Sequence, residues 1–583
     1  MGWIKSQSVL PRGTPSVRLC EGGPGFSHFM RLQAPLHSCA IYVRTVDIPR
    51  TKQRRRMVAK AHEGGYDADC RATVAALNAT CRAIHRVAVK VLWSRLFSLR
   101  PLVKCMPADL WTENVEDGSD LRSTISLTRP PDASEWGRFQ SNAALVTSFK
   151  RFGLAPDIDE DTYRTLCLYH PGSHPLLPNL RELIWEEPDA DVFEYGFQLL
   201  GPKLTTLHLG QPPSDSLLLP ILRSLHVKCP RLAHLSVQCR SSIGPVDPVV
   251  SRSISQLDHL ETVDMALPLF EDALIHIATL PGLSVAKVFI PRIPSIHDHL
   301  LSLDLPLFPS LSVLQLSAIG LEESFAHLMR LTASTQLTEV HLCTAHDPPA
   351  PMLREFLDIL SNGPSRDILS AVSIFSPLPS SIPLMLSLSA LPPLDRPECF
   401  LDASVLEPLF SCPELTELEL NSFFIKLDDE LIRLLATAFP RLQSLRLMPP
   451  YNAGRISEVT LEGLLPLFRH CPDLTHLAVP VNASAPPRAL DDTMHPSELL
   501  TLEVADSPIG FPDEVAAFLS AHCTHPSFSI LSAQVHEGDR DPEHMRLREL
   551  HSAMWDQVTR MVRLFVRVRS QERHGRAGKA PDR

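Results

Sequence analysis

A short apolar phrase, L-x-x-L-x-L with aliphatic or aromatic substitutions, returns along most of this 583-residue chain. Its first leucines follow one another at intervals of 23 to 46 residues. Alternating leucines place their side chains on one face of a short strand, so each unit has an apolar layer that only a stacked neighbour buries. Clear copies begin at Leu180, Leu204, Leu232, Leu260, Leu311, Leu337, Leu415, Leu442, Leu474 and Leu499, and poorer ones lie near Leu283 and Leu369.

The residues between the copies predict the rest of the repeat. Helix-like stretches such as residues 429–436 precede several copies, and a proline often stands between helix and strand, as at Pro413 and Pro472. Proline ends a helix and presets an extended entry to the strand. We therefore predict an α/β leucine-rich repeat solenoid, a curved parallel sheet with outer helices, in preference to a large globular α/β domain. The longest interval, between Leu369 and Leu415, predicts one further degenerate copy.

The pattern divides the chain into five predicted regions. Residues 1–65 are an irregular or disordered segment, 66–112 a small helical head, and 113–165 a connecting helical segment. Residues 166–535 form the solenoid, and 536–583 a C-terminal amphipathic capping helix with a basic tail. In that tail Leu547, Leu550, Met554, Val558, Met561, Phe565 and Val568 recur every three or four positions, as in one helical stripe.

Composition and motifs favour an intracellular protein that does not itself catalyse a reaction. The 13 cysteines form no C-x-x-C pair, the first 20 residues lack an apolar signal-peptide core, and no segment reaches transmembrane length. We expect a cytoplasmic or nuclear protein that does not associate with a membrane. Motifs of hydrolases, nucleotide-binding loops and zinc enzymes are missing, which predicts no enzyme, no cofactor and no metal. The only close groups of possible ligands, His297 to His299 and His522 to His525, are expected to be structural.

Charge is unevenly distributed. From Arg546 onward ten basic side chains face four acidic ones, so the tail carries +6 and the rest of the chain −17 of the total −11. An acidic body disfavours binding to a phosphate backbone. We therefore expect no nucleic-acid partner, and we expect Arg560, Arg563 and Arg567 to lie in solvent.

The head region carries a second pattern. Leu77, Cys81 and Ile84 step by three or four residues toward Leu92 and Trp93, as on one face of a helix. Their order resembles the later helices of an F-box. With Leu99, Pro101, Leu102, Leu110, Trp111, Ser134, Trp136, Arg138, Phe139 and the closing residues 555–573, the chain resembles F-box proteins with irregular leucine-rich repeats, as in mushroom-forming fungi (basidiomycetes).

The resemblance implies a substrate-recognition adaptor of a cullin-RING (Skp-cullin-F-box) ubiquitin ligase. In such adaptors the head binds a Skp-type linker protein and the repeats bind a protein substrate. The resemblance would place Leu77, Cys81, Ile84, Leu92 and Trp93 in or behind the linker-binding helices, with Trp93 as the large apolar anchor.

The opening helix of an F-box, which begins with Leu-Pro and an acidic residue, has no clear counterpart. Its nearest match is Ile48-Pro49, and the arginines that follow it at 54–56 do not form an apolar face. The alternative is therefore a ligase-independent leucine-rich repeat scaffold for protein interactions.

Overall fold

The computed structural model describes residues 82–115, 123–152, 158–172, 174–210, 212, 214–238, 248–375, 399, 401–421, 425–448, 457–487, 497–532 and 542–577. The chain falls into two compact units, divided in sequence between Leu92 and Trp93. Of the first unit, the structure describes residues 82–92, which belong to helix α4 (Arg82–Ser94). The second unit contains the repeats.

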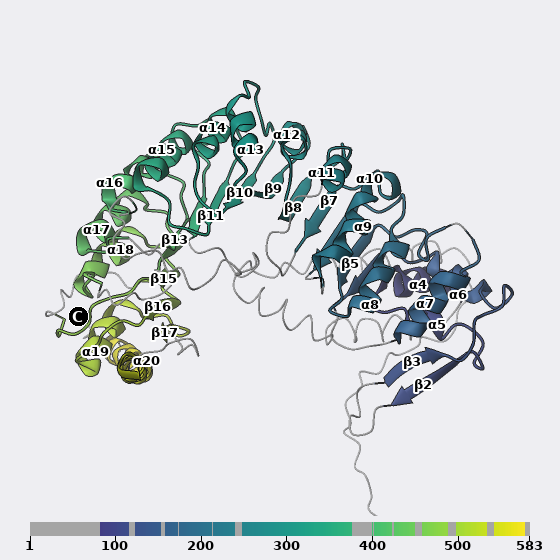
Figure 1. Cartoon of the computed structure of the whole chain (residues 1–583). Coiled ribbons are helices and arrows are strands. Elements are labelled where there is room, and N and C mark those ends of the chain that lie inside the picture. The colour runs from purple at the N-terminus through teal and green to yellow at the C-terminus, as the bar shows by residue number, and fades with distance from the viewer. Residues whose placement is uncertain are drawn as a thin grey trace, which may run out of the picture. The chain divides into compact units, whose positions relative to one another are not determined.

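Fifteen parallel strands make one sheet in the second unit, and their order in space follows their order in the chain (Figure 1). β1 and β17 lie at opposite edges, so the sheet is open. A separate antiparallel hairpin joins β2 (Trp111–Val115) to β3 (Ser123–Leu127). The sheet strands are β1 (Arg95–Leu96), β4 (Ser148–Arg151), β5 (Glu182–Glu186), β6 (Thr206–Gly210), β7 (His234–Val237), β8 (Thr262–Pro268), β9 (Val285–Ile290), β10 (Val313–Ala318), β11 (Glu339–Thr344), β12 (Ala371–Phe375), β13 (Glu417–Asn421), β14 (Ser444–Leu447), β15 (His476–Ala478), β16 (Thr501–Ala505) and β17 (Ser529–Ser532).

Helices cover one face of this sheet, with neighbouring repeats packed helix against helix (Figure 1). Most are short, and four of them adjoin a 3-10 segment of three to six residues. The α-helices after α4 are α5 (Arg100–Val103), α6 (Gly137–Ala143), α7 (Glu160–Tyr169), α8 (Ala190–Phe193), α9 (Leu218–Arg223), α10 (Leu225–Lys228), α11 (Pro248–Ile254), α12 (Glu271–Thr279), α13 (Pro294–Leu301), α14 (Glu323–Leu331), α15 (Ala350–Ser361), α16 (Ala403–Leu406), α17 (Asp429–Ala438), α18 (Leu465–His470), α19 (Pro512–His522) and α20 (Pro542–Ala577). The 3-10 turns are η2 (Glu194–Leu199), η3 (Asp215–Leu217), η5 (Glu407–Ser411) and η6 (Glu462–Leu464).

The repeating leucines form the layers of one continuous core. The middle leucine of each copy pairs in register with its counterpart on the next strand, for example Leu207 with Leu235 and Leu418 with Leu445. All of these side chains are at most 1% exposed. The predicted α/β leucine-rich repeat solenoid is confirmed, and the poorer copies at Leu283 and Leu369 are complete repeats that supply β9 and β12.

The proline turns have a common construction. The residue before proline, such as Cys412 or Cys471, ends the helix with a backbone outside the helical region, as expected from the clash with the proline ring. Its carbonyl then accepts a hydrogen bond from the first leucine of the phrase, 3.2 Å for Leu474 N to Cys471 O. Because both cysteine side chains are fully buried, they fill the corner between helix and strand.

Three expectations from the sequence differ from the structure. β12 is hydrogen-bonded directly to β13, from Ala371 opposite Glu417 to Phe375 opposite Asn421, so no further strand stands between these two in the sheet. The segment 113–165, predicted as helical, contains most of the β2–β3 hairpin and β4, which is already part of the sheet. The second unit also begins at Trp93, inside the range 66–112 predicted for the head.

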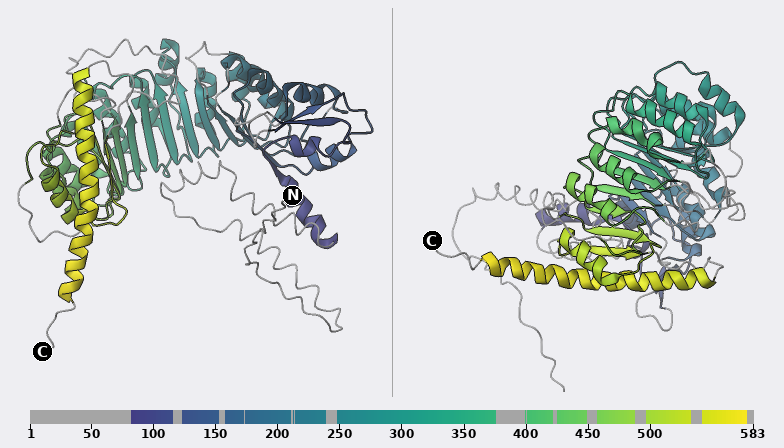
Figure 2. Two further views of the ribbon diagram at one scale, coloured as in Figure 1. Left: turned by 90° about the horizontal axis from the view of Figure 1, so that it is seen from below. Right: turned by 90° about the vertical axis from the view of Figure 1, so that its left-hand side faces the viewer.

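Helix α20 closes the last repeat, packed against α19 and β17 (Figure 2). Its buried contacts come from Trp555, Val558 and Val562, and the indole N–H of Trp555 donates to Ser507 O at 2.9 Å. The predicted stripe is only partly right, because Leu547, Leu550 and Val568 are about half exposed. A helix of 36 residues, about 54 Å, is longer than the layer it covers. Arg560, Arg563 and Arg567 are exposed as predicted. None of the described helices is both long and apolar enough to span a membrane.

Candidate partner-binding surface

The predicted head residues fall at the edge of the described chain. Leu77 and Cys81 lie outside the described residues, and Ile84 belongs to the first turn of α4. Leu92 and Trp93 are half-buried near the end of the same helix. Trp93 packs against the core of the second unit, so its ring supports the fold there.

The exposed side of α4 is apolar at two positions one turn apart. Val87 is 52% exposed and Val91 is 51% exposed. Residues four apart share one face of a helix, so both valines point the same way. A pair of exposed valines on one helical face is a small surface that a protein partner is able to cover.

The motif residues after α4 build the first layers of the solenoid. Leu99, Leu102 and Leu110 are at most 1% exposed, as are Trp136 and Phe139, whose rings meet edge to face with centroids 5.2 Å apart. They therefore act as core residues of the amino-terminal repeats.

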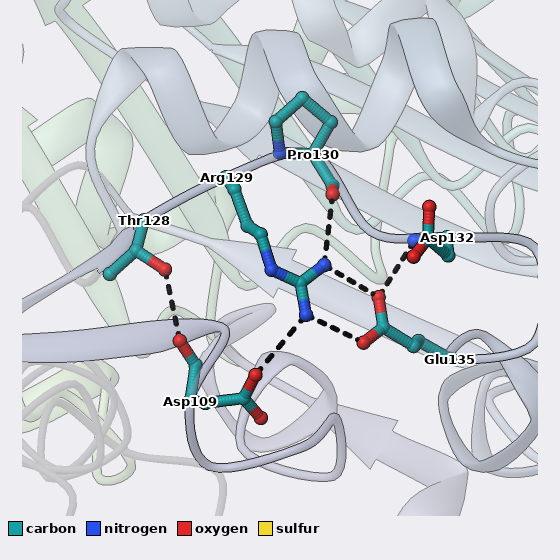
Figure 3. A network of polar contacts seen from close by, with 6 residues as sticks. All are labelled: Asp109, Thr128, Arg129, Pro130, Asp132 and Glu135. Carbon is teal, nitrogen blue, oxygen red and sulfur yellow. Dashed lines mark hydrogen bonds and ion pairs between the residues drawn. The ribbon is translucent and has the colours of Figure 1, made fainter.

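A surface network fixes the chain between β3 and α6 (Figure 3). Arg129 forms a bidentate pair with Glu135, at 2.8 and 2.9 Å, and reaches Asp109 Oδ2 at 3.1 Å. The Glu135 carboxylate also accepts the backbone N–H of Asp132 at 2.7 Å. The hydrogen bond from Arg129 lowers the pKa of Glu135 to about 2. This network sets the entry to α6 and thereby the position of Trp136.

The second surface is the strand face, defined here as the face of the sheet opposite the core leucines. Side chains alternate along a strand, so the residue between the last two core residues of each copy points to this face. In-register pairing joins these residues into one row across the sheet. The row runs through Ile184, His208, Ser236, Asp264, Lys287, Gln315, His341, Ser373, Glu419, Arg446, Ala478 and Glu503.

A pocket opens on the strand face between β7 and β10. Asp264 and Lys287 stand opposite each other in register in its middle. Burial raises the pKa of the Asp264 carboxyl, while Lys287, His208 and a hydrogen bond from Ser236 act against that rise. The pocket is lined chiefly by Gln238, Asp264, Lys287, Phe289, Gln315 and Ser317.

An apolar shelf adjoins the pocket at the carboxyl ends of β9 to β12. It consists of Phe289, Ile319, Cys343, Ala345 and Phe375, which form a cluster separate from the main core. Register pairing places Phe289 beside Ser317, Ser317 beside Cys343, and Cys343 beside Phe375. The shelf therefore continues across four strands on the side of the sheet that alternation would otherwise leave polar.

Carboxylates lie at the amino ends of two strands in this stretch, β11 and β13. Glu339 approaches His341 Nε2 at 3.5 Å, and burial lowers the pKa of His341, so the imidazole is neutral at pH 7. Glu417 is exposed, and within the described part of the chain its carboxylate has no hydrogen bond or ion pair.

Farther along, Arg446 bridges two strands at once. Its guanidinium lies 3.0 Å from Glu419 Oε1 and 2.6 Å from Glu503 Oε2. Ala478 stands between Arg446 and Glu503 in the register, and its small side chain leaves room for this reach. On the strand face beyond β13, the charges of Arg446 and Glu503 are thus paired with each other.

The two histidine groups do not assemble a metal site. His297 Nδ1 lies 2.6 Å from Ser324 Oγ. His522 is buried between the rings of Phe468 and Phe518, and burial lowers its pKa. Across the described ranges, no three possible metal-ligating side chains come together.

Sequence reasoning missed both the pocket and the shelf. A signal was available in the sequence. Two positions after the strand-face row, where a solvent-facing residue is expected, the chain has an apolar residue at Phe289, Cys343 and Phe375. Only the strand register shows that these residues are neighbours.

Comparison with known proteins gives distant likenesses. No family model matches the sequence, and no curated protein matches it. Among solved structures, a chain from the crystal structure of the Rad7 and Elc1 complex in yeast is similar over 74% of this chain and 98% of its own, with 14% identity and a TM-score of 0.34. An LRR protein of Leptospira interrogans is similar over 71% of this chain and 78% of its own, with 11% identity and a TM-score of 0.27.

Proposed function

We propose that this leucine-rich repeat protein is a substrate-recognition adaptor of a cullin-RING ubiquitin ligase. In this proposal the helical head binds a Skp-type linker protein and the strand face binds a protein substrate. The observation that carries the proposal is the strand face itself, a row of polar side chains across the sheet with a pocket and an apolar shelf beside it. Its excess of carboxylates disfavours nucleic acid as the partner.

The adaptor role requires no catalytic group from this chain. The thiols of Cys229, Cys343 and Cys471 are buried, and burial raises their pKa to about 12. Since the thiolate is the reactive form, these cysteines are poor nucleophiles at neutral pH. Proximity of a bound substrate to the ligase would supply the chemistry.

For the linker we propose a division of labour within α4. Trp93 packs on the core of the second unit and therefore supports the end of the helix. Val87 and Val91 present an exposed apolar pair and would contact the linker. Side chains that become buried at the centre of a protein interface usually carry most of its binding energy.

The test is a titration of the full chain with a Skp-type linker protein. Changing Val87→Asp and Val91→Asp together should weaken binding about tenfold or more, because two carboxylates would be desolvated at the interface. The control carries Leu168→Asp and Val227→Asp, which are 72% and 70% exposed on α7 and α10, and should bind like the unchanged chain.

The ligase-independent scaffold is the second candidate, favoured by the sequence after Ile48-Pro49, which does not show the apolar pattern of an F-box opening helix. It keeps the substrate side of the proposal and removes the linker. If the unchanged full chain does not bind the linker at high micromolar concentration, the scaffold replaces the adaptor.

A further inference from the structure

The strand face has a local charge imbalance between β8 and β13. The described strands in this stretch carry one ammonium group on their open face, that of Lys287. Four carboxylates share the face, those of Asp264, Glu339, Glu417 and Glu419. Only Glu419 has a strong cationic partner, Arg446, which it shares with Glu503. The remaining carboxylates leave the surface negative.

Three of these carboxylates lack full compensation for different reasons. The neutral imidazole of His341 does not cancel the charge of Glu339. Glu417 has no side-chain partner among the described residues. Asp264 is partly desolvated in the pocket, with Lys287 on the neighbouring strand. Covering such groups with a neutral or acidic partner would cost free energy, whereas a basic partner offsets the desolvation.

The apolar shelf provides a second and independent requirement. Phe289, Cys343 and Phe375 lie at the carboxyl ends of the strands, while Glu339 and Glu417 lie at the amino ends. Phe289 and Cys343 are buried, at 1% exposure each, whereas Ile319, Ala345 and Phe375 are partly exposed. A segment that crosses the strands therefore meets the carboxylates of β11 and β13 along one side and these partly exposed apolar residues along the other. Six strands at about 4.8 Å spacing span about 24 Å, the length of about seven extended residues.

We propose, on the basis of the proposed substrate role of the strand face, that the stretch from β8 to β13 binds a basic, amphipathic segment of a protein partner. Lysine or arginine side chains of that segment pair with Glu339 and Glu417. An adjacent large apolar side chain packs on the partly exposed shelf residues Ile319 and Phe375. Asp264 accepts a further donor from the segment in the pocket.

Selection of displayed random 12-residue peptides on the full chain tests this chemistry. Enriched peptides should combine at least two lysine or arginine residues with an aromatic or large aliphatic residue. Their synthetic versions should bind in a fluorescence anisotropy titration, more weakly at high salt because ion pairs near the surface are screened. Enrichment of acidic or uncharged peptides would overturn the proposal.

Matched variants locate the binding site. Glu339→Gln with Glu417→Gln removes two charges from the strand face and should weaken peptide binding about tenfold. Glu323→Gln with Glu514→Gln removes two exposed charges from α14 and α19 and should leave binding unchanged. Equal effects of the two pairs would place the peptide elsewhere and overturn the proposal.

Two further measurements separate the remaining outcomes. The Glu339 and Glu417 variant should bind the Skp-type linker like the unchanged chain, so loss of peptide binding alone concerns the strand face and leaves the linker proposal standing. Removal of residues 1–81, which include the basic run 52–56, should leave peptide affinity unchanged. A gain of tenfold or more would assign the surface to the chain's own amino-terminal residues and overturn the external partner.

Discussion

Trp555 is the largest buried side chain of the C-terminal helix α20 and fixes that helix to the solenoid. Its side chain is 1% exposed, and its indole N–H donates to Ser507 O at 2.9 Å. Val558 and Val562 are buried on the same side of α20. Substitution of Trp555 therefore removes both apolar contact and a hydrogen bond at the end of the repeat stack.

The two effects are separable by two variants. Trp555→Ala creates a large cavity, and truncation of a buried tryptophan costs about 3 to 5 kcal/mol. Trp555→Phe keeps most of the aromatic contact and removes the hydrogen bond to Ser507, leaving a buried carbonyl without its donor, at about 1 to 3 kcal/mol. The matched control is Leu550→Ala on the same helix, which is 55% exposed and should change stability by less than about 0.5 kcal/mol.

Hydrogen exchange is the appropriate assay because a solenoid couples each repeat mainly to its neighbours. In Trp555→Ala the amides of β16, β17 and α19 should lose protection, while those of β5 to β7 should keep theirs. A uniform loss along the sheet would contradict nearest-neighbour coupling. An effect of Leu550→Ala as large as that of Trp555→Ala would contradict the assigned buried face of α20.

Three further changes test the core. Leu418→Ala should lower the free energy of unfolding by about 2 to 5 kcal/mol in urea titrations, because the side chain is 1% exposed between two other layers. Glu187→Ala should cost about 1 to 3 kcal/mol, since it removes the buried ion pair of 2.7 Å with Arg151. Glu430→Ala, in an exposed pair, should cost less than about 0.5 kcal/mol. Burial lowers the pKa of His522 from 6.5, so below pH 6.5 the folded chain binds fewer protons than the unfolded chain. The free energy of unfolding should therefore fall as the pH drops through that range. His522→Leu should make this fall smaller.

The repeat was predictable because one physical rule acts on every copy. A residue such as Leu207 or Leu445 must face the core. The alternation of leucines therefore predicts where each strand lies, which of its side chains face the core, and that these side chains are buried. The same rule recovered the poor copies at Leu283 and Leu369. It fails at the long interval before Leu415, where it predicts a further strand although β12 pairs directly with β13. The phrase carries no information about how far apart two paired strands lie in sequence.

The binding surface was harder to predict for a related reason. Phe289, Cys343 and Phe375 are separated by 54 and 32 residues, and only the register of β9 to β12 makes them neighbours. In the tail, periodicity alone selected Leu550 as well as Val558, although the repeat beneath α20 buries only the second. The sequence suggests Trp93 as a linker anchor because its side chain is large and apolar. The same properties suit a residue that packs against the core, as Trp93 does, so they do not distinguish the two roles.

The central claim is that one chain holds two proteins at once, a linker on the head and a basic segment on the strand face. The direct measurement is light scattering coupled to size-exclusion chromatography on the full chain mixed with a Skp-type linker and a fluorescent peptide selected on the strand face. We predict a single species that contains the chain, one linker and the peptide, with each ligand bound as tightly as in the absence of the other. Displacement of the peptide by the linker, or no linker in the complex at high micromolar concentration, would contradict the adaptor.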